Sequence, residues 1–220
     1  MTHLDSEIHR LREDIIEMHR MIRTQLVKCR SALTSFDRDL AKEIVATERR
    51  INALELKIDR DSENILALFN PVAVDLRFIL AVLKINSNLE RIGDHAEGIA
   101  RYVLDLDKAS DPVYLEKYRV EEAFEAAVSM LDDSLNALLQ ENTALARKVF
   151  LKDEALDQLN KNATLITLDL IQKQSPDPLH YVNTMSIIRK LERCGDQTKN
   201  IAEEIIFFIE AKVLKHGSKG

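Results

Sequence analysis

The chain has 220 residues and a formal net charge of −6 at pH 7, with 31% charged residues, no Trp, 5 Gly and 4 Pro. So few Gly and Pro residues exclude a protein built from many strands and tight turns, and the abundance of charged and aliphatic residues is typical of long helices. The acidic balance, with no basic stripe visible along the sequence, argues against a protein that follows the phosphates of a nucleic acid.

Apolar residues recur every three or four positions along most of the chain from Leu4 onward, which predicts amphipathic helices and no strands. Residues that favour caps and turns interrupt the pattern, among them Asn70-Pro71 and Asp111-Pro112. Long helices joined by such short turns lie antiparallel, so we expect an all-α fold of bundled helices. The six predicted helices span 4–35, 38–69, 72–107, 114–141, 144–174 and 179–215.

The two halves of the chain resemble each other, and each contains the phrase Leu-Glu-Arg-x-Gly-Asp. LERIGDHAEGIAR at 89–101 corresponds to LERCGDQTKNIAE at 191–203, and ERRINALE at 48–55 corresponds to DEALDQLN at 153–160. Self-similarity at this distance predicts the internal duplication of a three-helix unit. We therefore expect two tandem three-helix bundles, over residues 1–107 and 114–216.

Each copy of the repeated phrase places two acids four residues apart, with a glycine between them. Like charges at this spacing destabilise a helix by about 0.2–0.5 kcal/mol per pair, and a glycine costs about 1 kcal/mol relative to alanine. Glu90 and Asp94, and likewise Glu192 and Asp196, lie away from the apolar stripe of their helix. Oxygen ligands gathered at one point suit hard cations such as Mg²⁺, Ca²⁺, Mn²⁺ or iron, so the pairs predict metal binding.

Two other helices carry polar residues at a similar spacing, and two alternatives to metal binding stay open. A solvated acidic face that was copied with the duplication is also compatible with the acids, although it leaves the costly glycine in both copies unexplained. A close contact between neighbouring helices explains the glycines. The metal prediction requires outward-facing oxygen atoms, so acids buried among leucines, or already paired with Lys or Arg, count against it. The additional residues are Glu48, Asn52, Glu55 and Asp59 in the second helix, and Asp153 and Asp157 in the fifth.

The N-terminus and the cysteines predict a cytoplasmic protein. The stretch MTHLDSEIHRLRED is charged from its first residues, unlike a signal peptide. No apolar run approaches the roughly 20 residues of a membrane span. Cys29 and Cys194 form neither a disulfide framework nor a metal-binding pattern, which fits reduced thiols.

An enzyme with a di-metal carboxylate site is a rival interpretation. Such bundles carry Glu-x-x-His pairs that point into the core, and no histidine here follows a glutamate by three positions. The sequence also shows no nucleophile with a base and no Gly-rich phosphate loop, so we expect no enzymatic activity. A purely structural scaffold without metal is the second alternative. His95 is expected to be packed or partly exposed and not a metal ligand.

The two repeated phrases, together with NPVAVDLRFILAVLKI at 70–85, resemble the PhoU family over nearly the whole chain. The resemblance implies two three-helix bundles side by side, often in a homodimer, and no enzymatic activity. It also implies a cytoplasmic adaptor between the ATPase subunit of the phosphate ABC transporter and the sensor histidine kinase of the phosphate regulon. Such an adaptor represses the regulon when phosphate is plentiful, binds no nucleic acid and meets the membrane only through its partners.

In some members of this family the acidic motifs hold multinuclear metal clusters on the protein surface, and the resemblance leaves Fe, Mn, Mg, Zn and Ca open. This chain departs from the pattern at Asn52, where an acid is common, and at Gln197, where a histidine is common. Lys199 stands in the second repeat where Glu97 stands in the first. We therefore expect metal at the first repeat more than at the second. The ligand pairs that the resemblance implies are Glu48 with Asn52, Glu90 with Asp94, Asp153 with Asp157, and Glu192 with Asp196.

Overall fold

A computed structural model describes residues 2–214, and the fold in this range is all-helical, as predicted. Helices form because the apolar residues line one side of each segment and the polar residues line the other. The sequence predicted six helices, and the described residues form seven. They are α1 (His3–Ser35), α2 (Arg38–Phe69), α3 (Ala73–Asp105), α4 (Pro112–Lys117), α5 (Val120–Gln140), α6 (Thr143–Gln172) and α7 (Pro178–Glu210).

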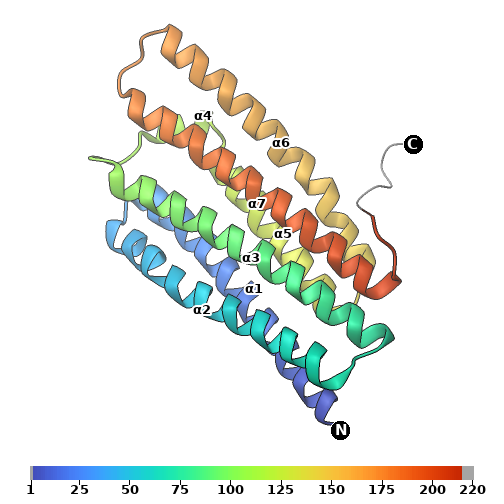
Figure 1. The fold of residues 1–220 in the computed structure, drawn as a ribbon. Helices are drawn as coiled ribbons and strands as arrows, with labels where there is room; N and C mark the ends of the chain where they lie inside the picture. Colours follow the sequence, from blue (N-terminus) through green and yellow to red (C-terminus); the bar gives the residue numbers. More distant parts are fainter. Residues whose placement is uncertain (1, 215–220) are drawn as a thin grey trace.

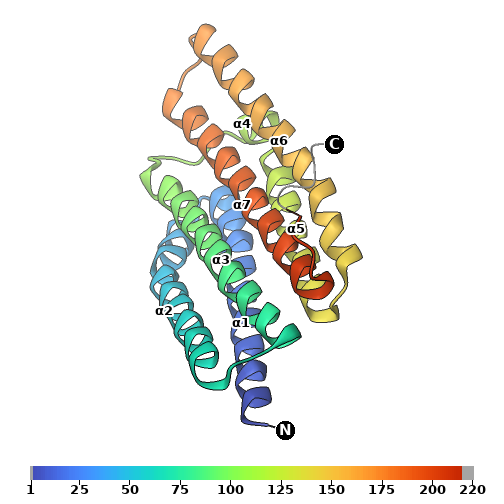
Figure 2. The ribbon, with the colours of Figure 1, turned by 45° about the vertical axis from the view of Figure 1, so that its right-hand side comes forward.

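The long helices form two layers. One layer consists of α2, α3, α7 and α6 side by side (Figure 1). Helices α1 and α5 form the second layer and pack against one face of the first. Helix α1 packs against α2 and α3, and α5 packs against α6 and α7, as the turned view also shows (Figure 2). The two halves meet where α3 contacts α7 and where α1 contacts α5. The domain limits at 107 and 114 stay a prediction, and the outer limits at 1 and 216 lie outside the described residues.

Local signals in the sequence explain most of the helix ends. Asp37 caps α2, since its carboxylate accepts hydrogen bonds from the backbone N–H groups of Asp39 and Leu40 at 3.0 and 2.9 Å. Asn70, just before Pro71, ends the same helix in the left-handed conformation with φ 47°. The observed α2 spans the same residues as the prediction because both of its ends carry such signals.

The predicted helix over 114–141 is wrong, because the structure divides it into α4 and α5. The chain breaks at Tyr118 and Arg119, and Arg119 adopts a left-handed conformation with φ 53°. The Tyr118 side chain is buried, and its hydroxyl lies 2.6 Å from the hydroxyl of Thr167 in α6. No glycine or proline marks the break between α4 and α5 in the sequence. The buried contact between Tyr118 and Thr167, which are 49 residues apart, stabilises it instead.

The last helix ends earlier than expected. Helix α7 stops at Glu210, where Ala211 adopts a left-handed conformation with φ 55° and donates its N–H to the carbonyl oxygen of Phe207. The expected end at 215 lies outside the described residues. Within residues 2–214, the helices lack any stretch long and apolar enough to cross a membrane.

Candidate functional site

Oxygen-bearing side chains gather between α2 and α3 in a surface depression of about 600 Å³. The depression is lined by Glu48 and Asn52 of α2 and by Asp94 and Glu97 of α3, and Glu90 lies close enough to Glu48 to raise its pKa. We call these five residues the first acidic groove. The structure thus brings together the two predicted pairs of the first repeat. Glu97, which the implied pairs omit, joins them because it follows Asp94 by three positions on the same helix face.

Glu48 is the most buried acid of the first acidic groove, with 7% of its surface exposed. Its Oε1 atom has no hydrogen-bond partner among residues 2–214. Burial, followed by the charges of Asp94, Glu97 and Glu90, raises the pKa of Glu48 to about 7. Lys42, Arg49 and Arg101 also line the depression, and Arg101 pairs with Glu97. Among residues 2–214 none of these cations forms an ion pair with Glu48, Glu90 or Asp94, so a bound cation would relieve the repulsion among these three acids.

The acid Glu90, next to Glu48, also has a raised pKa, caused by burial and then by the charge of Asp94. Asn86 lies on the same side of α3, off its apolar stripe, and is nevertheless fully buried. Its Nδ2 atom donates to the carbonyl oxygen of Glu55 and to Oδ1 of Asp59, each at 2.9 Å. Asn86 therefore ties α3 to α2, because α2 covers this side of α3.

The two glycines of the repeated phrase lie where neighbouring helices come close. A Cβ atom on Gly93 would lie 3.1 Å from Cδ1 of Ile22 and 3.4 Å from Oε2 of Glu48. A Cβ atom on Gly195 would lie 2.7 Å from Cδ1 of Leu156 and 3.4 Å from an oxygen of Asp153. The close helix contact, one of the two alternatives for these glycines, is therefore present in both repeats. The same absence of a side chain also leaves room for the buried carboxylate of each neighbouring helix.

The equivalent groove of the second repeat contains its own cation. Asp153 of α6 and Asp196 of α7 lie close together, since one lysine contacts both. Burial, followed by the charges of Asp196 and Asp157, raises the pKa of the neighbouring Glu192. Lys199 donates from Nζ to Asp153 at 2.5 Å and to Asp196 at 3.1 Å. Burial opposes the charge of Lys199, but these hydrogen bonds prevail and raise its pKa. We call Asp153, Asp157, Glu192 and Asp196 the second acidic groove.

The expectation that all eight predicted ligands face outward is only partly met. Glu48 is buried, and so is Asp153 at 7% exposure. Asp153 and Asp196 are already paired with Lys199. Within residues 2–214, no three His, Cys, Asp or Glu side chains already surround a common point as metal ligands do. The remaining predicted ligands are partly or fully exposed and make no ion pair within this range: Asn52, Glu90, Asp94, Asp157 and Glu192.

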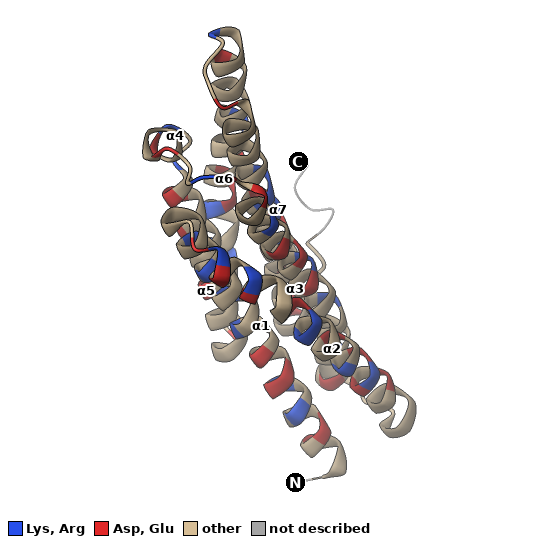
Figure 3. Ribbon diagram, turned by 90° about the vertical axis from the view of Figure 1, so that its left-hand side faces the viewer, with Lys and Arg blue, Asp and Glu red and all other residues tan. Residues whose placement is uncertain are grey.

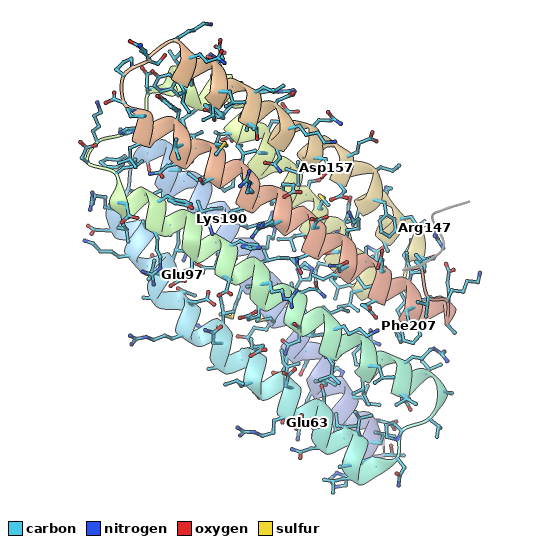
Figure 4. The ribbon with its side chains drawn as sticks, turned by 45° about the horizontal axis from the view of Figure 1, so that its top comes forward. Glu63, Glu97, Arg147, Asp157, Lys190 and Phe207 are labelled. Carbon is cyan, nitrogen blue, oxygen red and sulfur yellow. The ribbon has the colours of Figure 1, made fainter. Side chains whose placement is uncertain are left out.

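A group of basic residues between α3 and α7 was not expected from the sequence. Acidic and basic residues are interspersed along the helices (Figure 3). Around His95, however, cations predominate: burial, followed by the charges of Lys190, Arg193 and Arg91, lowers the pKa of His95 to about 4. The three cations therefore lie near one imidazole, and Figure 4 shows Lys190 between the two helices. We call Arg91, Lys190 and Arg193 the seam cations. His95 is half-buried, in line with the expectation of a packed or partly exposed side chain, and its role toward metal stays a prediction.

Comparisons with known proteins agree with the repeat. A family model described as the PhoU domain matches residues 15–103 and 120–205. A protein of Aquifex aeolicus, named phosphate-specific transport system accessory protein PhoU homolog, is 32% identical over 216 residues, which cover 97% of this chain and 96% of that protein. The accessory protein PhoU of Escherichia coli is 26% identical over 213 residues, 96% of this chain and 87% of that protein.

Two solved structures have a similar fold. PhoU from Pseudomonas aeruginosa gives a TM-score of 0.89 at 28% identity and covers 94% of this chain and 99% of that chain. The phosphate transport system regulatory protein PhoU from Streptococcus pneumoniae gives a TM-score of 0.86 at 28% identity and covers 96% and 99%. The similarity in sequence and in structure thus extends over nearly the whole length of both.

Proposed function

Because the chain belongs to the PhoU family, we propose that it is a regulatory accessory protein of phosphate transport. It links the ATPase subunit of the phosphate ABC transporter to the sensor histidine kinase of the phosphate regulon and represses the regulon when phosphate is plentiful. It works in the cytoplasm, as a homodimer, and reaches the membrane only through these partners. The observation that carries the proposal is the family match in both halves of the chain.

We infer that the protein acts by binding and not by catalysis. Both cysteines are buried and free, and burial raises the pKa of each thiol, which leaves them unreactive. His19 lies 2.9 Å from the hydroxyl of Ser134, but neither residue has exposed surface, so no substrate reaches this pair.

We propose that the first acidic groove binds a divalent or trivalent metal ion through Glu48, Asn52, Glu90 and Asp94. Three observations support it: an unpartnered carboxylate oxygen on the buried Glu48, the raised pKa of the same group, and exposed carboxylates within reach on α3. Oxygen donors of this kind suit Mg²⁺, Mn²⁺, Ca²⁺ or iron better than soft metals. Bound metal would neutralise the groove and give the partner proteins a surface of lower charge.

The second acidic groove is the weaker candidate. Its predicted ligands Asp153, Asp157, Glu192 and Asp196 offer the same oxygen chemistry, but Lys199 occupies the place between two of them. A metal ion entering this groove would have to displace the lysine ammonium. We therefore propose one preferred metal site, in the first repeat.

Co-purification from phosphate-replete cells, with elemental analysis of the same sample, tests the partners and the metal together. We expect the transporter ATPase and the kinase in the sample, with metal bound to the wild type. The variant Glu90→Ala/Asp94→Ala should fold, lose metal and bind its partners less well. Glu63→Ala is the matched control, since Glu63 is an exposed acid on α2 that lies outside both grooves and makes no ion pair within residues 2–214. Unchanged metal content and partner recovery in the double variant would disprove the metal proposal, and absence of both partners from the wild-type sample would disprove the adaptor proposal.

A further inference from the structure

We propose that the free end of the α6–α7 hairpin is the surface through which two copies of this chain form a symmetric dimer. The inference rests on the homodimer of the proposed function and names its interface, and it does not depend on the metal site. Large apolar side chains with exposed fractions between 38% and 64% gather at this end. Monomeric proteins rarely leave a large continuous apolar area uncovered. We call these residues the hairpin patch: Leu165, Leu168 and Ile171 of α6, and Leu179 and Val182 of α7.

The residues of the hairpin patch lie near one another because of the helix period and the antiparallel packing of the two helices. The members on each helix follow one another at three-residue spacing, which makes them neighbours on its surface. Helices α6 and α7 pack against each other from the contact between Asp153 and Lys199 to the turn at 173–177. The last turns of α6, with Leu168, therefore lie beside the first turns of α7, with Val182.

The hairpin patch lies on the same face of the molecule as the second acidic groove. An α-helix returns to nearly the same direction after 11 residues, which are about three turns. Leu168 follows Asp157 by 11 residues on α6, and Met185 precedes Asp196 by 11 residues on α7. Val182, one turn before Met185, extends this face toward the end of the hairpin. That end reaches beyond the neighbouring end of α3 (Figures 1 and 2), so a second molecule can approach it.

Helix α4 supports the hairpin end and keeps it in shape. The Tyr118 hydroxyl lies 2.6 Å from the Thr167 hydroxyl, and Lys117 lies 3.5 Å from Asp169. The rings of Tyr114 and Tyr181 meet edge to face, with their centres 6.3 Å apart. A surface that is already formed loses little conformational entropy when it binds a partner.

The end of the hairpin carries few charges, and they are paired. Among residues 162–188 the charged ones are Asp169, Lys173 and Asp177, whereas 31% of the whole chain is charged. Asp169 pairs with Lys173 at 2.8 Å, and Asp177 pairs with Lys108 at 2.9 Å. Figure 3 shows the same sparse charge along the upper part of the hairpin. Two copies with a net charge of −6 each repel one another least when they meet at such an end.

The first repeat carries charges where the second carries three leucines of the hairpin patch. The duplication places Arg60 and Glu63 of α2 and Arg77 of α3 at the positions equivalent to Leu165, Leu168 and Leu179. Arg60 and Glu63 are exposed, so the equivalent face of the first repeat is solvated. The continuous apolar face is therefore particular to the second repeat.

A second copy fits the hairpin patch better than a lipid membrane does. In a symmetric dimer the same patch meets itself, so an unpaired charge on it would face a like charge. The aliphatic side chains of the hairpin patch have no charge to repel their counterparts, and their burial drives association without directional partners. A helix that lies on a membrane carries Lys or Arg beside its apolar face and aromatic residues within it. Within 162–188 the one lysine, Lys173, is paired with Asp169, and the one aromatic residue, Tyr181, is buried.

Sedimentation velocity of the full-length protein tests the interface. At about 100 μM chain we expect the wild type to sediment as a dimer with twice the 25.2 kDa of one chain. Leu168→Glu/Val182→Glu and Leu168→Lys/Val182→Lys should each weaken the dimer by at least about a hundredfold, because like charges then meet in a desolvated contact. An equimolar mixture of the two double variants should dimerise again, since opposite charges meet. Leu151→Glu, at a leucine of α6 that is 80% exposed and lies outside the hairpin patch, is the matched control and should stay dimeric.

The possible outcomes separate this interface from the homodimer itself. A dimer that persists in both double variants would overturn the interface and leave the homodimer in place. Equal weakening in Leu151→Glu, or a mixture that stays monomeric, would also refute self-pairing of the hairpin patch. Loss of the dimer in Val72→Glu, at the exposed end of the first repeat, would replace the symmetric contact by a head-to-tail one.

A monomeric wild type would refute both the interface and the homodimer, but not the accessory role, which co-purification tests separately. Flotation of that monomer with phosphatidylglycerol vesicles, lost in Leu168→Glu/Val182→Glu, would assign the hairpin patch to a membrane instead. Circular dichroism of each variant checks that the fold is retained.

Discussion

Lys199 on α7 occupies the position that Glu97 occupies on α3, and its ammonium group donates to Asp153, the counterpart of Glu48. The two acidic grooves are thus built alike, but only in the second does a lysine bridge two of the predicted ligands, Asp153 and Asp196, within the described residues. In the first, Glu97 adds to the negative charge, and its partner Arg101 binds it at 2.7 Å along the same helix. The duplicated grooves have therefore diverged through a reversal of charge at one position.

Lys199→Met should destabilise the fold. The substitution keeps the length of the side chain but leaves the buried carboxylate of Asp153 without its donor, so we expect a loss of about 1–3 kcal/mol in the free energy of unfolding. Urea unfolding at pH 7 measures it. Lys148→Met, at an exposed lysine of α6, is the control and should change stability by less than about 0.5 kcal/mol. Equal stability of the two variants would contradict the structural role of Lys199.

Lys199→Glu should give the second repeat a groove like the first. The substitution removes the internal cation and adds a carboxylate beside Asp153 and Asp196. Under the metal proposal, we expect Mn²⁺ to raise the melting temperature of this variant more than that of the wild type. Elemental analysis should then find additional metal per chain. A variant whose melting temperature does not respond to Mn²⁺ would show that the groove geometry, and not only its charge, excludes metal.

Two of the internal glycines, Gly98 and Gly195, should respond differently to alanine. Alanine gains about 1 kcal/mol over glycine in a helix. At Gly98 the new methyl group meets only the flexible end of Lys190, so we expect Gly98→Ala to be neutral or stabilising. At Gly195 it would lie 2.7 Å from Leu156 in a packed contact, so Gly195→Ala should cost about 1–3 kcal/mol. Urea unfolding of both variants gives the order, and a reversed order would contradict these contacts.

Features that depend on neighbouring residues were predictable from the sequence, and features that depend on distant contacts were not. The ends of α2 follow from the cap at Asp37 and from Asn70, which act within a few residues. Asn86 lies off the apolar stripe of α3, a position that the sequence alone would leave exposed, but the covering helix α2 buries it. The seam cations also depend on a distant contact, since Arg91 and Arg193 are far apart in sequence and come onto the same seam only when α3 packs on α7.

The break between α4 and α5 gives a test of such a distant contact. Tyr118→Phe removes the hydroxyl that lies 2.6 Å from the Thr167 hydroxyl, while Thr167 keeps its hydrogen bond to the carbonyl oxygen of Ala163 at 2.9 Å. We expect a loss of about 0.5–1.5 kcal/mol in unfolding free energy. Tyr102→Phe removes a partly exposed hydroxyl and is the matched control. Similar losses in both variants would show that the buried hydrogen bond adds nothing specific.

The stability of the metal-free protein should fall as the pH rises from about 4.5 to about 7. Burial, followed by Asp94, Glu97 and Glu90, raises the pKa of Glu48 in the folded protein to about 7 from its ordinary 4.5. In this range the folded protein keeps a proton that the unfolded chain has released, so each rise in pH favours unfolding until Glu48 is ionised in both states. Glu48→Gln should lose this part of the pH dependence and should exceed the wild type in stability at pH 8. Urea unfolding between pH 5 and pH 8, in a buffer with chelator, provides the measurement, with Glu63→Gln as the exposed control. If Glu48→Gln keeps the slope of the wild type, Glu48 does not hold a proton in the folded protein near neutral pH.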